Sequence, residues 1–257
     1  MRQFANTDPG VLDRLRIAIA RVERAGVGRA PAVLPFGVAA IDAVLPQQGL
    51  LAGALHEVMG QEPAGALFAA GILARRAGQV LWVVERGDVF GPGLAGAGLH
   101  PDRVLYAEAG KQVLLVMEEG LRQKGLAGVV GEITGRLTLT ASRRLQLAAE
   151  STGAMAIALR RPKKLIAPEP NAAVTQWRVS ALPSGPALSS APEVPGVGRG
   201  RWRLELLRSR GGRMGEWMVE ACDAAGYLDL VSPLADRPAA ALPHYSRVGG
   251  ALRHRAA

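Results

Sequence analysis

The sequence predicts an α/β fold built on a mostly parallel, twisted β-sheet, with helices on both faces and antiparallel strands late in the chain. Three observations lead to this prediction. Short apolar runs alternate with helical stretches between residues 54 and 160, the texture changes after residue 160, and a glycine-bracketed turn joins the first buried strand to the helix after it. We expect three regions, namely an N-terminal helix (1–30), the α/β core (31–228) and a C-terminal tail (229–257).

The alternating part supplies the parallel strands and the helices that cover them. Apolar runs predict four buried strands, at 54–60, 79–85, 126–133 and 154–160. Three helices, each closed by a glycine, are predicted at 64–78, 111–125 and 140–153. Later, the segments 175–182 and 201–209 alternate apolar with polar residues, as half-exposed strands do. The Pro/Gly/Ser-rich segment 183–200 between them predicts a mobile loop.

The composition predicts a globular protein of the cytoplasm. Of the 257 residues, 49% are hydrophobic and 21% are charged, which is the balance of a folded domain. No apolar run approaches the roughly 18 residues of a membrane span, and we expect no membrane contact. The N-terminus carries Asp8 and Pro9, which favour a helix start over a secretory signal. A single cysteine, Cys222, fits a reducing compartment.

The positive charge lies mainly in the second half of the chain. The net charge of the whole chain is +9, and residues 160–257 contribute 15 basic and 8 acidic side chains, or +7. An anionic partner such as nucleic acid would explain this balance. A solvated, arginine-rich surface explains it equally well, and the sequence leaves both interpretations open.

The glycine turn has the spacing of a phosphate-binding loop (P-loop) but lacks its ligands. Four residues separate Gly60 from Gly65, as the motif requires, whereas Ala66 and Leu67 occupy the positions of the lysine and the serine or threonine. The lysine places a charge on the phosphates and the hydroxyl binds magnesium. We therefore expect a degenerate P-loop, no ATPase activity and no cofactor. The alternative is an ordinary strand-to-helix turn.

The order of landmarks resembles the RecA recombinase core over about residues 33–228. The matching positions before the P-loop are Gly37, Ile41, Asp42, Gly49, Leu50, Gly53 and Glu57. The resemblance implies that Glu85 stands where RecA-type ATPases keep the glutamate that orients the attacking water. It places Glu132, which follows Gly131, near the magnesium-binding carboxylate, as a glutamate out of place. We expect both carboxylates to be vestigial.

Among RecA-like chains with a dismantled P-loop, the sequence resembles the ImuA family. The segments 142–160 and 234–239 both look like that family. The resemblance implies a role in mutagenic translesion synthesis after DNA damage, as part of the SOS response. The implied partners are RecA, an ImuB-type polymerase-like protein and its error-prone polymerase.

The segment between two of the predicted strands suggests contact with single-stranded DNA. The resemblance to RecA points to this loop, and four cations cluster in five positions, at Arg160, Arg161, Lys163 and Lys164. Trp177 and Trp202 are candidates for stacking on bases. The alternatives are a solvated charge cluster and core tryptophans.

The remaining motifs predict no further chemistry. The histidines have no metal-ligand spacing with one another or with Cys222, which we expect to be a buried small residue; they are His56, His100, His244 and His254. Two other functions stay open. One is a divergent RecA-type ATPase that uses Arg75 or Arg76 as a substitute cation, and the other is a cell-division inhibitor of the SulA type.

Overall fold

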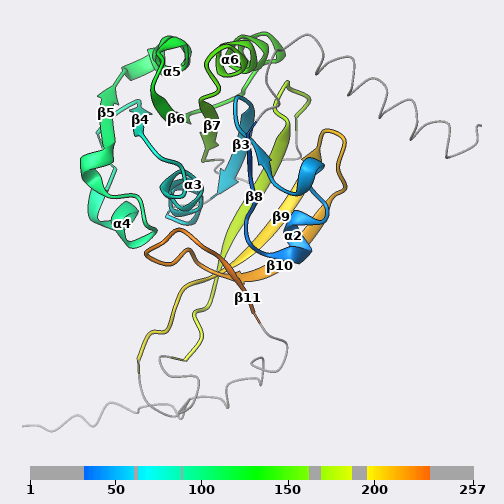
Figure 1. Cartoon of the computed structure of the whole chain (residues 1–257). Coiled ribbons are helices and arrows are strands. Elements are labelled where there is room, and N and C mark those ends of the chain that lie inside the picture. The colour runs from blue at the N-terminus through cyan, green and yellow to red at the C-terminus, as the bar shows by residue number, and fades with distance from the viewer. Residues whose placement is uncertain (1–31, 61–62, 88, 162–168, 187–195, 232–257) are drawn as a thin grey trace, which may run out of the picture.

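The computed structural model describes residues 32–60, 63–87, 89–161, 169–186 and 196–231 (Figure 1). The predicted N-terminal helix (1–30) and residues 232–257 of the predicted tail lie outside these ranges. A nine-stranded sheet forms the centre of the described part, and a small second sheet pairs β1 (Val33–Leu34) with β2 (Leu50–Leu51).

The nine-stranded sheet has the order β11-β10-β9-β8-β3-β7-β6-β4-β5. Its strands are β3 (Leu55–Gly60), β4 (Gln79–Val84), β5 (Val104–Glu108), β6 (Leu126–Ile133), β7 (Met155–Arg160), β8 (Thr175–Leu182), β9 (Arg201–Ser209), β10 (Gly215–Glu220) and β11 (Asp229–Leu230). The six strands from β8 to β5 pair in parallel, and β8 to β11 pair antiparallel. The predicted fold class is confirmed.

Helices cover both faces of the sheet, as expected for a parallel sheet buried on both sides. The α-helices are α2 (Ala39–Asp42), α3 (Ala64–Ala74), α4 (Gly91–Gly96), α5 (Val113–Arg122) and α6 (Leu139–Thr152). Short 3-10 helices lie at Pro46–Gln48, Pro101–Arg103 and Gly110–Gln112. Figure 1 shows α5 and α6 on one side of the sheet and α3 and α4 on the other.

The two faces bury separate apolar clusters. One cluster surrounds α3 and contains Phe68, Trp82 and Trp177, and the other lies under α5 and α6 and contains Met117 and Leu145. Helix α3 is buried on nearly all sides, because apolar and small residues follow one another around it rather than forming a single stripe. The central strand β3 and helix α3 therefore form the rigid middle of the fold.

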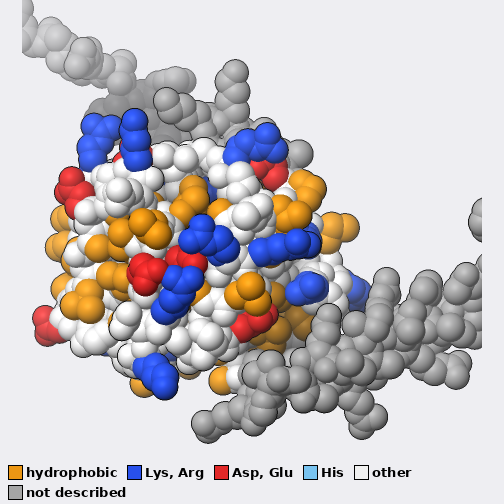
Figure 2. All heavy atoms as spheres, turned by 90° about the horizontal axis from the view of Figure 1, so that it is seen from above, with side chains coloured by type: hydrophobic (Ala, Val, Ile, Leu, Met, Phe, Trp, Pro, Cys, Tyr) orange, Lys and Arg blue, Asp and Glu red, His pale blue; other side chains and the backbone are white. Residues whose placement is uncertain are grey.

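The structure adds an edge strand that apolar periodicity did not predict. Strand β5 has only five residues, and although Val104 to Ala107 are apolar, Leu105 and Tyr106 are both exposed. No helix in the described ranges combines the length and apolar character needed to cross a membrane. Seen from the side of α5 and α6, Figure 2 shows basic side chains spread over the surface with acidic ones among them.

Candidate functional site

The glycine turn lies at the carboxyl end of β3, where α3 begins. Gly60 and Gly65 are both buried and pack against each other. A Cβ atom on Gly60 would lie 2.9 Å from the Cα atom of Gly65, and a Cβ atom on Gly65 would lie 3.0 Å from Cδ1 of Leu159. A side chain at Gly60 would therefore force the strand end and the helix start apart, whereas one at Gly65 would press on the Leu159 side chain, so close packing favours glycine at both positions.

The two ligand positions after the turn carry only apolar side chains. Ala66 and Leu67 lie in the first turn of α3 and pack, half-buried, against the apolar cluster around that helix. Neither side chain has a charge or a hydroxyl group. The side chains at these positions therefore offer nothing to a phosphate group or to its magnesium ion.

The two predicted vestigial carboxylates do come together. Glu85 directly follows β4 and Glu132 lies near the end of the neighbouring strand β6, so both belong to the carboxyl edge of the sheet. They line one pocket of about 170 Å³, which Arg86, Thr134, Ile133 and Arg161 complete. The Thr134 hydroxyl donates a hydrogen bond of 2.8 Å to Oε2 of Glu85.

Both oxygens of Glu132 are engaged by donors of the chain itself. Nε1 of Trp82 donates a hydrogen bond of 2.7 Å to Oε1, and Nη2 of Arg161 lies 2.5 Å from Oε2. The Glu132 side chain is 8% exposed. Burial lowers the pKa of Arg161, but arginine stays charged in proteins and so compensates the carboxylate. A metal ion at Glu132 would have to bind beside the positive charge of Arg161, which would repel it.

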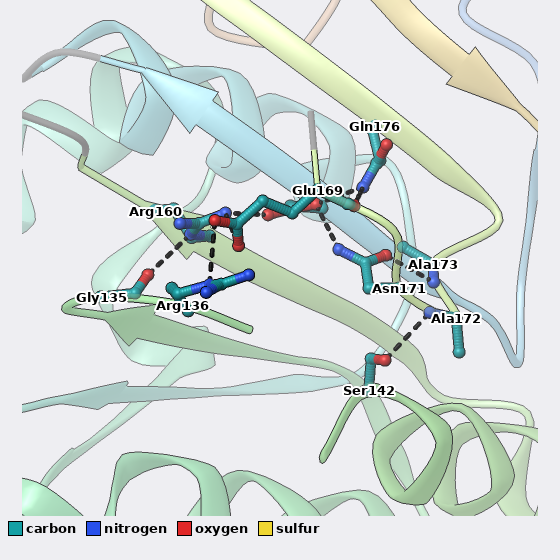
Figure 3. A network of polar contacts seen from close by, with 10 residues as sticks. Gly135, Arg136, Ser142, Arg160, Glu169, Asn171, Ala172, Ala173 and Gln176 are labelled. Carbon is teal, nitrogen blue, oxygen red and sulfur yellow. Dashed lines mark hydrogen bonds and ion pairs between the residues drawn. The ribbon is translucent and has the colours of Figure 1, made fainter. Parts of the chain in front are cut away.

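Arg160 does not belong to an exposed basic cluster. Its side chain is 4% exposed, and Nη1 lies 2.9 Å from Oε1 of the fully buried Glu57. Nε of Arg160 donates to the Gly135 carbonyl at 2.9 Å (Figure 3). Oε2 of Glu57 accepts hydrogen bonds of 2.7 Å from both the Asn171 and the Gln176 side-chain amides. This network ties β3, β7 and β8 together beneath the carboxyl edge.

The predicted DNA-binding cluster is therefore divided. Because successive side chains of a strand point to opposite faces, Arg160 reaches Glu57 on β3 while Arg161, the next residue, reaches Glu132 on β6. The prediction that Arg160 is a surface cation was wrong, because its guanidinium group is buried and paired with the Glu57 carboxylate. Lys163 and Lys164 lie outside the described residues, and DNA contact by them stays a prediction.

The network around Glu57 is the part of the site that sequence reasoning missed. Glu57 was only a landmark of the resemblance, and no role was expected for Asn171 or Gln176. A signal was present in the sequence. A lone glutamate within a buried apolar strand requires a partner of opposite charge, and Arg160 closes another buried strand of the same sheet.

The two tryptophans proposed for base stacking are core residues. Trp177 is 0% exposed and Trp202 is 4% exposed. Trp177 packs edge-on against Phe36 with ring centroids 5.4 Å apart, and its Nε1 donates to the Thr175 hydroxyl at 2.8 Å. Stacking on nucleic-acid bases is excluded for both side chains in this structure. Strand spacing had left this alternative open, and burial decides it.

The proposed substitute cations are engaged at the opposite end of α3. The guanidinium group of Arg75 lies 5.4 Å from the ring centre of Phe36 and 5.3 Å from that of Tyr227. Arg76 donates hydrogen bonds to the carbonyls of Ala127 at 2.9 Å and Gly153 at 3.2 Å. These positions follow the last residue of the helix, whereas the glycine turn precedes its first residue. Neither arginine replaces the P-loop lysine.

No metal site is found in the described part of the chain. Its histidines, cysteine and carboxylates form no group of three or more that could hold an ion. His56 is buried between the Thr175 hydroxyl and the Leu51 carbonyl, and burial lowers its pKa to about 4. Burial likewise raises the pKa of Cys222 to about 12, so its thiol is a poor nucleophile. His244 and His254 lie outside the described residues.

The sheet order, the glycine turn and the paired carboxylates define a RecA-like core. The solved structure titled "Crystal structure of the RadB recombinase" is similar in fold, with a TM-score of 0.56. The match covers 77% of this chain and 100% of that chain at 17% sequence identity, so it supports the fold alone. No family model matches the chain.

Two curated relatives show which RecA-like family this is. Protein ImuA of Caulobacter vibrioides (strain NA1000 / CB15N) is 37% identical over 249 residues, which cover 88% of this chain and 99% of that protein. Protein ImuA of Caulobacter vibrioides (strain ATCC 19089 / CIP 103742 / CB 15) gives the same values. The chain belongs to the ImuA family, as the sequence predicted.

Proposed function

We propose that this protein is a non-catalytic accessory factor in DNA-damage-induced mutagenesis. Its RecA-like core would serve as a scaffold for translesion synthesis rather than as an ATPase. Membership of the ImuA family and the RecA-like fold support the mutagenesis role. The proposed partners are RecA, an ImuB-type polymerase-like protein and its error-prone polymerase, and the proposed location is the cytoplasm.

One observation carries the non-catalytic part of the proposal. Glu132, the carboxylate that the RecA resemblance places near the magnesium-binding position, is paired with Arg161 and hydrogen-bonded by Trp82, at an edge where Ala66 and Leu67 offer no phosphate ligand. A hydrogen bond to a charged group contributes roughly 1.5–3 kcal/mol, or about ten- to over a hundredfold in affinity. Losing two such contacts removes most of the affinity for a nucleoside triphosphate.

Titration with a fluorescent ATP analogue and magnesium tests this part directly. We expect no saturable binding in the micromolar range and no phosphate release above background. The matched control is a variant that restores the missing groups, Ala66→Lys/Leu67→Thr/Arg161→Met, in which the last change removes the guanidinium group beside Oε2 of Glu132. We expect this variant to gain measurable binding. Micromolar binding by the unchanged chain would refute the non-catalytic proposal and favour the divergent ATPase.

A pull-down from DNA-damaged cells tests the scaffold role. The tagged protein is recovered before and after damage, and the captured proteins are identified by mass spectrometry. We expect enrichment of RecA and of a polymerase-like protein after damage. Recovery of cell-division proteins without RecA would instead favour the SulA-type inhibitor. Filamentation of cells that overexpress the protein would support that outcome.

A further inference from the structure

The turn between β9 and β10 carries the most exposed uncompensated charge of the described C-terminal strands. Arg210 and Arg213 are exposed, and neither forms an ion pair with another of the residues that the structure describes. The acids on the flanking strands are already matched. Glu205 lies 3.3 Å from Arg178, and Glu216 lies 2.7 Å from Arg203. Two positive charges therefore project from the turn with no carboxylate to balance them.

The turn is held rigidly by the neighbouring segments. The backbone N–H of Arg210 donates to the Val174 carbonyl at 2.8 Å, and that of Arg213 donates to the Val44 carbonyl at 2.9 Å. Gly212 packs so closely that an added Cβ atom would lie 2.4 Å from Oγ of Ser209. Gly211 has a φ of +79°, which glycine adopts without strain. Because the backbone of the turn is already fixed, only the arginine side chains have to be ordered when a ligand binds.

A second unusual feature lies in the segment whose Val44 carbonyl binds this turn. Gln47 and Gln48 have φ angles of 58° and 60°, and among the described residues they alone have positive φ without being glycine. Both are exposed, and they follow Val44, which binds the turn, by three and four residues along the chain. Strained residues of this kind concentrate at functional sites. Amide side chains are also common donors to phosphate and sugar oxygens.

We propose that Arg210 and Arg213, together with Gln47 and Gln48, bind the phosphodiester backbone of a nucleic acid. We name these four residues the hairpin-tip surface. Guanidinium groups bind phosphate in a bidentate manner, and two of them separated by a glycine pair suit a polyanion that passes across the turn. None of these four residues belongs to the basic cluster predicted from the sequence. A nucleic acid bound here would be the anionic partner that the net positive charge of residues 160–257 suggests.

The inference deepens the proposed scaffold role by giving the protein its own contact with nucleic acid. Its test uses the purified full chain without partners, so it can fail while the scaffold role stands. Fluorescence anisotropy is measured with a labelled single strand and with the corresponding duplex, over a series of salt concentrations. The variant Arg210→Ala/Arg213→Ala is compared with Lys124→Ala/Arg143→Ala, which removes two other exposed, unpaired cations. Both variants lower the net charge of +9 by the same amount.

We expect the hairpin-tip variant to bind at least about tenfold more weakly at roughly 100 mM salt, while the control loses less than about threefold. The plot of log affinity against log salt should become less steep, with the magnitude of its negative slope smaller by about 1.4 for the single strand and about 1.8 for the duplex. Binding of both forms supports recognition of the shared backbone, and a preference identifies which form is the ligand. Equal losses in both variants, or no loss, would overturn the proposal.

Two further measurements test whether the ligand is a nucleic acid and whether the two glutamines contribute to binding. A glutamate-rich peptide of equal charge should not compete with the nucleic acid, and efficient competition would assign the surface to an acidic protein instead. The variant Gln47→Gly/Gln48→Gly relieves the backbone strain and removes both amides. We expect it to resist urea as well as or better than the unchanged chain while binding about threefold more weakly. Unchanged binding would remove the two glutamines from the surface.

Discussion

Two glycine turns lie at opposite ends of the nine-stranded sheet, and each has part of what an anion-binding site needs. One has the backbone shape of such a site, and the other has the positive charge. The turn from Gly60 to Gly65 ends β3 and opens α3, but the side chains that follow it are apolar. The hairpin tip follows Ser209, which pairs with Thr175 at the start of β8. It carries unpaired arginines on a fixed backbone.

The difference shows that backbone shape and charge are separable requirements. At the first turn the glycines are required because a strand end and a helix start touch, so the shape persists after the phosphate ligands are lost. At the hairpin tip both arginines are exposed, so removing their side chains should cost binding far more than folding. Substitutions behind and within each turn can break or sharpen this comparison.

The largest expected effect comes from the ion pair behind the first turn. Arg160→Met leaves the Glu57 carboxylate buried without its cation, and breaking a buried pair in this way costs about 3–5 kcal/mol. Urea denaturation followed by circular dichroism measures the loss. The matched change at the hairpin tip, Arg210→Met, should alter the free energy of unfolding by less than about 0.5 kcal/mol.

A double variant separates lost charge compensation from lost packing. Glu57→Gln/Arg160→Met removes both charges and keeps an oxygen for one of the amides of Asn171 and Gln176. We expect it to be more stable than Arg160→Met alone. If the two variants are equally unstable, the Glu57 charge is not the cause. If Arg210→Met is as damaging as Arg160→Met, the two regions do not differ as argued.

A smaller effect is expected from His56, which lies level with Thr175 at the end of the sheet nearer the hairpin tip. Its pKa is lowered from 6.5 to about 4, chiefly by burial, with a further lowering by Arg76. Below pH 6.5 the unfolded chain therefore binds a proton that the folded chain excludes. The free energy of unfolding should fall by up to about 3 kcal/mol as the pH drops from 6.5 to 4.

Urea titrations at several pH values test this expectation. His56→Gln cannot take up a proton at this position, so the stability difference between the two proteins should shrink as the pH falls below 6.5. Above pH 6.5 the difference should be constant, because His56 is then neutral in both the folded and unfolded states. A difference that stays constant down to pH 4.5 would contradict the lowered pKa.

The sequence specified the fold better than the site because the two depend on different signals. Short, largely apolar segments such as 126–133 favour buried strands, and all four predicted parallel strands are present. The edge strand β5 was missed, because its apolar run from Val104 to Ala107 is short. The loss of the P-loop ligands at Ala66 and Leu67 could also be read directly, since it concerns residue types at a fixed spacing.

The fate of individual charges could not be read in this way. Arg160 and Arg161 are adjacent in a cluster that looks uniform, yet one is nearly fully buried and the other half-buried, because a strand directs them to opposite faces. Their partners, Glu57 and Glu132, are distant in sequence and are fixed only by the order of β3, β7 and β6. Charge pairing of this kind requires the sheet topology, which local patterns do not contain.

The smallest effects distinguish why each turn contains glycine. Gly60→Ala forces a methyl group against the backbone of Gly65, and we expect a loss of about 1–3 kcal/mol from overpacking. Gly211→Ala meets no atom within 4 Å and costs only the strain of its φ of +79°, or about 1 kcal/mol. Gly96→Ala, with open space and no positive φ, is the control and should be neutral or slightly stabilising. Urea midpoints rank the three variants. A Gly60→Ala protein as stable as the Gly96→Ala control would show that packing does not require the first turn's glycines, and their persistence would then point to a retained anion.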